Sequence, residues 1–318
     1  MKYLNLPATD RQASAIVLGC AWFGTDIPER KAFKLMDKFS ELGANFLDTA
    51  HSYASWVPGG AGKSETTIGK WLKRSQRERV VIGTKCADKG MSENLIRAQL
   101  DESLKRLDTD YVDFYWLHCD DPGVPVGDIL QWLNRLCDER RIRAFGCSNW
   151  RVPRIRQAMQ HAREHGLREF AASQIAWSLA RVRPEVVAGG SQVFMDDETF
   201  AFHKQTGMPV VAYSSQAGGF FTEKYEPDGP PPGDKPNPAI VKYYGTPENY
   251  AKQAAAKKLA AAKGCTPNQI ALAYLLHQSF PGFAIAGANT PERVADSCAA
   301  ADLKLSAEEV ALLERGGS

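Results

Sequence analysis

Residues 80–118 read VVIGTKCADKGMSENLIRAQLDESLKRLDTDYVDFYWLH, and this stretch shows the pattern of the whole chain. An apolar run at 80–85 is followed by an amphipathic segment and by a second apolar run at 111–118. The two runs do not alternate cleanly between apolar and polar residues, which is typical of strands buried on both faces. The segment at 93–107 follows Ser92, a predicted N-cap, and has helical periodicity. The stretch is therefore a predicted strand–helix–strand unit.

The same alternation continues on both sides of this unit. Eight strands are predicted, at 15–19, 45–48, 80–85, 111–118, 142–147, 169–174, 209–213 and 283–286, and helices are predicted between them, among others at 29–41, 126–139 and 153–165. This pattern and the chain length favour a closed (β/α)₈ TIM barrel over an open doubly wound sheet. We expect residues 1–318 to form a single domain. The lead segment 2–6 is expected to pair with a strand near Ala13 as a hairpin at the barrel bottom.

Helix starts are marked most clearly near the end of the chain. Threonine precedes proline at Thr246–Pro247, Thr266–Pro267 and Thr290–Pro291. Threonine is a good N-cap, and proline fits the first helical position because its missing N–H would be unpaired there. Thr266 with Gln269 and Ser306 with Glu309 also match the capping-box spacing. These patterns predict four helices in the last quarter of the chain.

A proline-rich segment at 222–245 interrupts the rhythm. It holds prolines 227, 230, 231, 232, 236 and 238 of the 18 in the chain. One interpretation is a linker between two domains. The other is a long loop after the seventh strand, and we favour it because the strand–helix rhythm resumes beyond the segment. Long loops in compact domains are commonly lids or binding loops.

Composition excludes several classes of protein. Lys and Arg number 39 against 37 Asp and Glu, so the net charge is +2, which argues against a nucleic-acid partner or a polybasic membrane contact. No apolar run reaches 18 residues, and the first residues lack the apolar core of a signal peptide. The seven cysteines contain no C-x-x-C, so we expect reduced thiols, no metal site and a cytoplasmic location. Oligomeric state is left open.

Hydrogen-bonding side chains close five neighbouring apolar runs. In chain order they are Asp48, Lys85, His118, Ser148 with Asn149, and Gln174. The C-terminal strand ends of a (β/α)₈ barrel share one face, where its chemistry gathers. Taken singly, each residue has another interpretation: Asp48 as the cap of a loop, Lys85 as an exposed lysine and His118 as a satisfied core histidine. Their equivalent positions favour a shared functional site.

Tyr53, five residues after Asp48, completes a set suited to proton transfer. A phenol normally titrates near pH 10, which is too high for an effective acid at neutral pH. A neighbouring ammonium lowers the pKa of a phenol, and Lys85 is the candidate. Asp48 is expected to hold Lys85 charged and oriented, and His118 to hydrogen-bond a carbonyl oxygen beside Tyr53. This set suits proton delivery to a carbonyl while hydride reaches its carbon.

Five motifs together resemble the aldo-keto reductases. They are LDTAHSY (47–53), VIGTK (81–85), YVDFYWLH (111–118), GCSN (146–149) and AGANTPERVADS (286–297), and they cover nearly the whole chain in the family's order. The resemblance implies a barrel that binds a nicotinamide dinucleotide, usually NADPH, and reduces carbonyls or oxidises alcohols. It implies Tyr53 as general acid/base, Asp48 and Lys85 as the groups that tune it, and His118 as the group that orients the substrate.

The resemblance also implies a set of cofactor-binding positions. They are Cys20, Ala21, Asp48, Ser148, Asn149, Gln174, Tyr213, Ser214, Gln216, Gly218, Gly287, Asn289, Arg293 and Ser297. Ser148, Asn149 and Gln174 match the side chains that hold the carboxamide, and Tyr213 matches the aromatic stacked on the nicotinamide, with packing at the barrel rim as its alternative. Ser215 and Gln216 depart from the family's Ser-Pro-Leu-Gly. Gly287 and Ser297 replace a common lysine and asparagine. Arg293 remains to pair with a 2′-phosphate, so NADPH is preferred over NADH.

Tryptophans follow three of the predicted strands. Trp22, Trp56 and Trp150 are expected to line the substrate pocket with His118, although packing between barrel and helices explains Trp150 equally well. An aromatic pocket suits a sugar-like ring, and hence carbohydrate metabolism, or an aromatic carbonyl.

The run at 59–64, GGAGKS, is not a P-loop, because residue 57 is valine where that motif needs glycine. We expect it to be a loop whose following helix is capped by Ser64 and Glu65.

Two other functions are compatible with these residues. The same barrel is compatible with a non-catalytic, nicotinamide-binding regulatory subunit, although such a protein need not keep all four residues of the set. A lysine at a strand end is also compatible with a lyase that forms a Schiff base on Lys85. That reading leaves the pairing of Asp48 with Tyr53 unexplained. The sequence therefore favours an NAD(P)H-dependent carbonyl or alcohol oxidoreductase.

Overall fold

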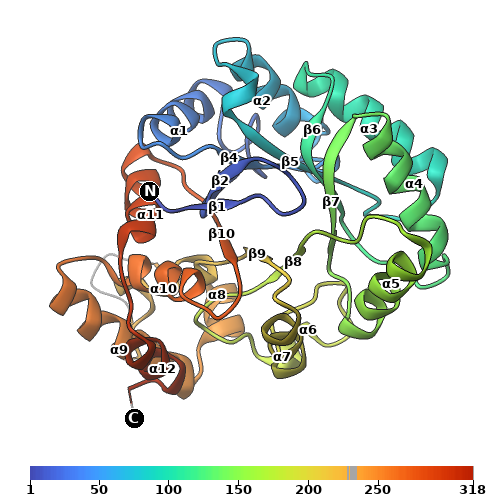
Figure 1. Ribbon diagram of the computed structural model, residues 1–318. Helices are drawn as coiled ribbons and strands as arrows, with labels where there is room; N and C mark the ends of the chain where they lie inside the picture. The colour runs from blue at the N-terminus through green and yellow to red at the C-terminus, as the bar shows by residue number, and fades with distance from the viewer. Residues whose placement is uncertain (228, 230–234, 318) are drawn as a thin grey trace.

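A computed structural model describes residues 1–227, 229 and 235–317 and contains a closed barrel of eight parallel strands (Figure 1). Around the barrel the strands follow the order β10-β3-β4-β5-β6-β7-β8-β9. Their bounds are β3 (Ile16–Gly19), β4 (Phe46–Asp48), β5 (Val81–Cys86), β6 (Val112–Leu117), β7 (Ile142–Ser148), β8 (Ser173–Ala176), β9 (Val210–Tyr213) and β10 (Gly282–Ala286). The predicted (β/α)₈ barrel is confirmed.

Helices surround the barrel and cover the outer faces of its strands (Figure 1). They are α1 (Glu29–Glu41), α2 (Lys63–Leu72), α3 (Glu93–Leu107), α4 (Val126–Asp138), α5 (Val152–His165), α6 (Pro184–Val187), α7 (Asp197–Thr206), α8 (Pro238–Tyr244), α9 (Pro247–Lys263), α10 (Pro267–Leu276), α11 (Pro291–Ala299) and α12 (Ala307–Arg315). Short 3₁₀ turns lie at Arg77–Arg79, Ala217–Gly219, Glu223–Tyr225 and Ala300–Asp302. Helix α9 packs against α12, the last helix of the chain, and both lie near the C-terminus in Figure 1.

Side chains fill the inside of the barrel. Phe114 stacks on Trp116 with ring centroids 4.1 Å apart, and Phe46 meets Phe283 edge to face at 6.1 Å. All four rings are buried in an inner core that is separate from the larger core between strands and helices. Burial on both faces explains why the strands show no alternation in the sequence.

The N-terminal hairpin is present as β1 (Tyr3–Asn5) paired antiparallel with β2 (Gln12–Ser14). It lies across the barrel in Figure 1, and Leu6 and Ala13 are buried with the inner core. The hairpin thus closes one end of the barrel and leaves the opposite end, where the strands finish, for function.

Most predicted helix caps are confirmed. Ser92, Thr246, Thr266 and Thr290 each accept a hydrogen bond from the third backbone N–H of their helix, and Ser306 forms a full capping box with Glu309. The box predicted at Thr266 is only half formed, because the Gln269 side chain donates to Asp296 at 2.8 Å instead. Caps depend on neighbours along the chain, which is why sequence predicts them well.

The predicted caps of α2 are wrong. Gly62, at φ 71°, precedes the helix, while Ser64 donates to the carbonyl of Cys20 at 2.7 Å. Glu65 accepts from Thr84 at 2.7 Å and pairs with Arg106 at 3.2 Å. Both side chains are buried and join α2 to the barrel. The Ser64 hydroxyl and the Glu65 carboxylate therefore bond to distant residues and do not cap the helix.

The sixth barrel strand begins later than predicted. It covers Ser173–Ala176, so Gln174 lies within the strand and opposite Ser148 of β7. Upstream, Ala171 donates to the carbonyl of Phe145 at 2.9 Å and Ala172 accepts from Cys147 at 3.2 Å, while Phe170 packs on Phe145 and Trp150 with ring centroids 5.9 and 5.0 Å away. Helix α7, which no prediction included, follows; Asp196 caps it at 2.8 Å.

The proline-rich segment follows β9 and includes α8, as expected for a loop rather than a linker. Gln253 of α9 is buried and donates to the carbonyls of Phe220, Thr222 and Tyr225 at 2.7, 3.4 and 3.1 Å. These bonds fasten the first half of the segment to the barrel's helical layer. Prolines 230, 231 and 232 lie outside the described residues.

Candidate active site

Two charged residues form a buried ion pair at the strand ends. Asp48 closes β4 and Lys85 lies near the end of β5, with Lys85 Nζ 2.6 Å from Asp48 Oδ2 and 2.7 Å from the carbonyl oxygen of Thr49. The two side chains are 2% and 0% exposed. Burial opposes charge on Lys85, but Asp48 and Tyr53 together raise its pKa above the ordinary value. Lys85 is therefore an ammonium at neutral pH.

Tyr53 lies on the turn after β4, beside this pair. Lys85 Nζ is 4.6 Å from the centre of the Tyr53 ring. Burial raises the pKa of the phenol, and Lys85 lowers it by a smaller amount. Lys85 thus lowers the pKa of Tyr53 as predicted, but the net pKa lies above the ordinary value because desolvation outweighs the nearby charge. Tyr53 is a neutral phenol whose ionised form is partly stabilised by Lys85.

His118 follows β6 directly, and its ring meets that of Tyr53 edge to face at 5.9 Å. Burial and the positive charge of Lys85 lower the pKa of His118 to about 4. The ring is thus neutral at physiological pH and carries one N–H. Within the described part of the chain, its buried Nδ1 has no hydrogen-bond partner.

Gln174 and Asn149 tie the neighbouring strand ends together. Gln174 Nε2 donates to Asp48 Oδ1 at 3.0 Å, so both carboxylate oxygens of Asp48 are engaged. Asn149 adopts φ 60° and donates to the carbonyl of His118 at 3.0 Å. Its own oxygen accepts from the Tyr213 hydroxyl at 2.7 Å and from the backbone of Val193 at 3.1 Å. Ser148, buried, accepts from the Asn149 amide at 3.2 Å.

A cleft of about 1340 Å³ opens from this group between the loops after β9 and β10. Of the sequence-predicted site residues, those in its lining are Cys20, Ala21, Trp22, Asp48, Tyr53, Tyr213, Ser214, Gln216, Gly218, Gly287 and Arg293. Asn289 and Ser297 stand just behind: Asn289 accepts from Arg293 at 3.0 Å, and Ser297 from Gln216 at 3.3 Å. The structure therefore brings residues from both ends of the sequence into one cleft.

Of the three predicted pocket tryptophans, Trp22 lines the cleft and Trp56 lies against Trp22. Trp22 and Trp56 are 46% and 51% exposed and meet edge to face at 5.3 Å, and Trp56 lies 6.1 Å from the Tyr53 ring. Trp150 does not belong to this group. It is 1% exposed and packs on Phe170, as the packing alternative supposed.

Several cleft residues were missed by sequence reasoning. They include Phe221, Lys224, Tyr225, Glu226, Lys257, Asn268 and Asp296. Lys257 and Glu226 form an ion pair across the rim, joining α9 to the loop after β9. Asn268 donates to Asp296 at 2.7 Å and accepts from Gln216. Near Asn268 the sequence shows the Thr266–Pro267 motif, which predicts the start of a helix but does not indicate a cleft.

The described residues contain no cluster of three or more His, Cys, Asp or Glu side chains arranged to hold a metal ion. Within the same residues, no helix is both long and apolar enough to cross a membrane.

The model of the Aldo/keto reductase family matches residues 15–316. The chain belongs to the aldo/keto reductase family. It is thus an oxidoreductase that acts on carbonyl or alcohol substrates, and nicotinamide cofactors serve this family. An aryl-alcohol dehydrogenase from Pestalotiopsis microspora is 28% identical over 94% of this chain and 76% of its own length. Norsolorinic acid reductase B from Dothistroma septosporum is 29% identical over 99% and 81%.

A solved structure has the same fold as this aldo/keto reductase. It is a thermostable aldo-keto reductase in complex with the inhibitor epalrestat, 25% identical in sequence, and it matches with a TM-score of 0.77 over the full length of both chains. The agreement extends beyond the barrel, since the match leaves no part of either chain uncovered.

Proposed function

We propose that this aldo/keto reductase is an NAD(P)H-dependent carbonyl reductase, or in reverse an alcohol dehydrogenase, with Tyr53 as its general acid/base. The observation that carries the proposal is the buried Asp48–Lys85 pair lying against the face of Tyr53 at the floor of the cleft. Burying an ion pair is costly, and such a pair beside a phenol in a cleft is typical of a functional site.

Each residue has a distinct part in the proposed reaction. The neutral Tyr53 phenol delivers its proton to the carbonyl oxygen, and Lys85 stabilises the phenolate that remains. Asp48 keeps Lys85 protonated. Gln174 donates to the other oxygen of Asp48 and so holds this carboxylate, and with it Lys85, in place. His118, neutral because its pKa is about 4, donates a hydrogen bond to the same carbonyl oxygen. In the oxidation direction, Tyr53 accepts the proton of the alcohol.

The cleft residues fit a nicotinamide dinucleotide. When bound, the cofactor supplies or accepts the hydride. Tyr213 offers an aromatic ring beside Asn149, Ser214 and Gln216 line the same cleft, and Arg293 is an exposed residue of its lining. A guanidinium there suits a 2′-phosphate, so NADPH is the proposed cofactor, with NADH as the alternative.

We further propose a substrate with an aromatic ring next to its carbonyl. Trp22 lines the cleft, and Trp56 meets it at an interplanar angle of 74°, so the two exposed rings offer a face and an edge to a planar ring. One relative is named for aryl alcohols, which agrees with this choice. A sugar-like ring is the competing substrate, and a panel of aryl aldehydes and aldoses separates the two.

The test of the proposed acid/base is Tyr53→Phe, with Tyr3→Phe as the matched control because Tyr3 lies in the hairpin at the other end of the barrel. We expect Tyr53→Phe to bind NADPH normally and to lose aldehyde reduction by about 10² to 10⁴-fold, the usual value of general acid catalysis. The control should keep wild-type turnover. Wild-type turnover in Tyr53→Phe would reject the assignment. Binding of NADPH without turnover of any carbonyl by the wild type would support a regulatory subunit instead.

The cofactor preference is tested by Arg293→Met, with Arg79→Met at the opposite end of the barrel as the control. Tryptophan-fluorescence titration should show weaker NADPH binding in Arg293→Met and unchanged NADH binding. Equal wild-type affinity for the two dinucleotides would refute the preference for NADPH.

A further inference from the structure

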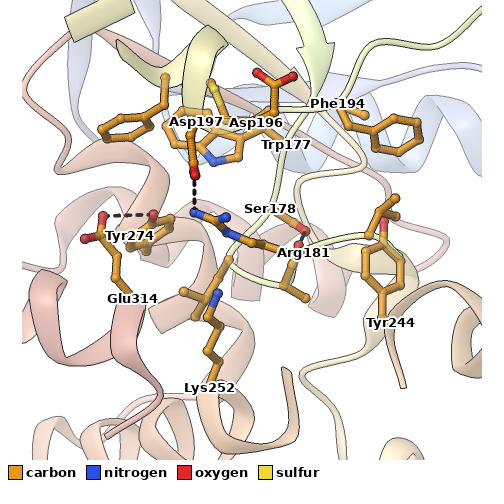
Figure 2. A pocket seen from close by; sticks show the side chains of 16 residues that line it. Trp177, Ser178, Arg181, Phe194, Asp196, Asp197, Tyr244, Lys252, Tyr274 and Glu314 are labelled. Carbon is orange, nitrogen blue, oxygen red and sulfur yellow. Dashed lines mark hydrogen bonds and ion pairs between the residues drawn. The ribbon is translucent and has the colours of Figure 1, made fainter. Parts of the chain in front are cut away.

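A second pocket lies outside the cofactor cleft. It has a volume of about 160 Å³ and is enclosed by the chain after β8, the start of α7 and helices α9, α10 and α12 (Figure 2). None of the described residues that line it also lines the cleft. Neither the family resemblance nor the proposed reaction uses this pocket.

Two cations reach the pocket. Lys252 of α9 has a side chain only 4% exposed, and its Nζ is 2.9 Å from Glu248, whose side chain is 61% exposed. Arg181 extends across the pocket to Asp197 at 3.0 Å, and Asp197 is 85% exposed (Figure 2). Each cation is thus held by a carboxylate on a solvent-exposed side chain. The Arg181–Asp197 pair is exposed on both sides and contributes little free energy, so Asp197 can turn into water at little cost. The Lys252 ammonium is buried, so a ligand that displaces Glu248 must bring a negative charge of its own.

The walls of the pocket are aromatic. Trp177 is 6% exposed and lies edge to face with Tyr274 and Phe200, with centroids 6.2 and 6.3 Å away, and Tyr244 closes the opposite side (Figure 2). A cavity of about 150 Å³ is known to hold benzene, so this pocket has room for one six-membered ring.

Two other carboxylates of the pocket each accept one hydrogen bond from the chain. Asp196 accepts from the backbone of Thr199 at 2.8 Å as the cap of α7, and Glu314 accepts from the Tyr274 hydroxyl at 3.1 Å. Lys252 differs, because an ammonium has three N–H donors and Glu248 engages one of them. The ammonium therefore keeps donors for a further partner in a pocket that also contains Asp196, Asp197 and Glu314.

We propose that this pocket binds a small aryl carboxylate, whose carboxylate replaces the exposed acids on Lys252 and Arg181 while its ring lies among the aromatic walls. The buried ammonium supplies a charge-assisted bond in a largely desolvated place, where such bonds are strong. The chain thus carries a ligand site separate from its catalytic cleft.

The test uses benzoate as the probe and benzamide as its neutral isostere, measured by calorimetry on full-length protein saturated with NADPH. We expect benzoate to bind at least tenfold more tightly than benzamide. Lys252→Met and Arg181→Leu should each weaken benzoate at least tenfold, whereas Lys258→Met, an exposed lysine on the same helix, should leave binding unchanged.

Three results would overturn the proposal. The first is the absence of benzoate binding, and the second is equal affinity for benzamide. The third is binding that survives both substitutions, which would assign benzoate to the catalytic cleft. Because Arg181 is 61% exposed, its substitution leaves the fold intact and keeps the test decisive if Lys252→Met unfolds. The outcome is independent of the Tyr53 experiment.

Discussion

Breaking the buried pair of Asp48 and Lys85 should show how strongly the fold supports this site. Lys85→Met leaves the Asp48 carboxylate buried with Gln174 as its hydrogen-bond donor. Removing one partner of a buried ion pair costs about 3–5 kcal/mol. With a urea m-value of about 3 kcal/mol per M, the unfolding midpoint should fall by about 1–1.7 M. Urea unfolding followed by tryptophan fluorescence measures this shift.

The cost in Lys85→Met should also depend on pH. Burial raises the pKa of Asp48, and Lys85 is the largest influence that lowers it. Without Lys85 the folded-state pKa rises further, so folded Asp48 holds a proton at pH values where the unfolded chain has released it. Stability then falls as pH rises between the unfolded and the folded pKa, and the variant should lose less stability at pH 5 than at pH 8.

The double variant Asp48→Asn with Lys85→Met removes both charges and keeps an oxygen that Gln174 can bond. It should be more stable than Lys85→Met alone, because no uncompensated charge is left buried. Equal midpoints for Lys85→Met and wild type would refute this account of the pair. So would a double variant less stable than Lys85→Met.

Three further predictions concern separate parts of the chain. NMR titration of His118 should show no protonation between pH 5.5 and 8, because burial and Lys85 hold its pKa at about 4, and a midpoint near the ordinary value of about 6.5 would contradict this. Gly218→Ala should weaken NADPH binding several-fold, since the new Cβ would lie 2.2 Å from Ile240 Cδ1; adding Ile240→Ala should restore only part, because residue 218 keeps φ 64°. Ser306→Ala should cost about 1 kcal/mol in urea unfolding through loss of the capping box, with kcat unchanged.

Much of the site could be predicted because it follows from local order along the chain. Asp48, Lys85 and His118 each end an apolar run, and parallel strands finish at the same face of a barrel. Their meeting is therefore a consequence of strand order alone. The exact bounds of a strand are not determined by strand order. Gln174 was expected at the end of its strand, but it lies inside β8, which continues to Ala176.

Electrostatic properties of the same residues could not be predicted. The sequence shows that a lysine and a tyrosine lie near each other, which argues for a lower pKa of Tyr53. The net direction depends on how much water reaches the phenol, and burial proves the larger influence. Trp150 and Ser64 were misassigned for a related reason: both have partners far away in sequence, and no local pattern names those partners.

The sequence by itself determined the order of the barrel strands and of most helices between them, most helix caps, the barrel and the residues at its strand ends. Each of these depends on periodicity or on neighbours within a few positions. The tertiary structure decided which tryptophans face the cleft, which polar groups are spent on packing, which way the pKa values move, and that a second pocket exists behind β8. These properties depend on burial and on contacts between distant segments, and only the folded chain brings those segments together.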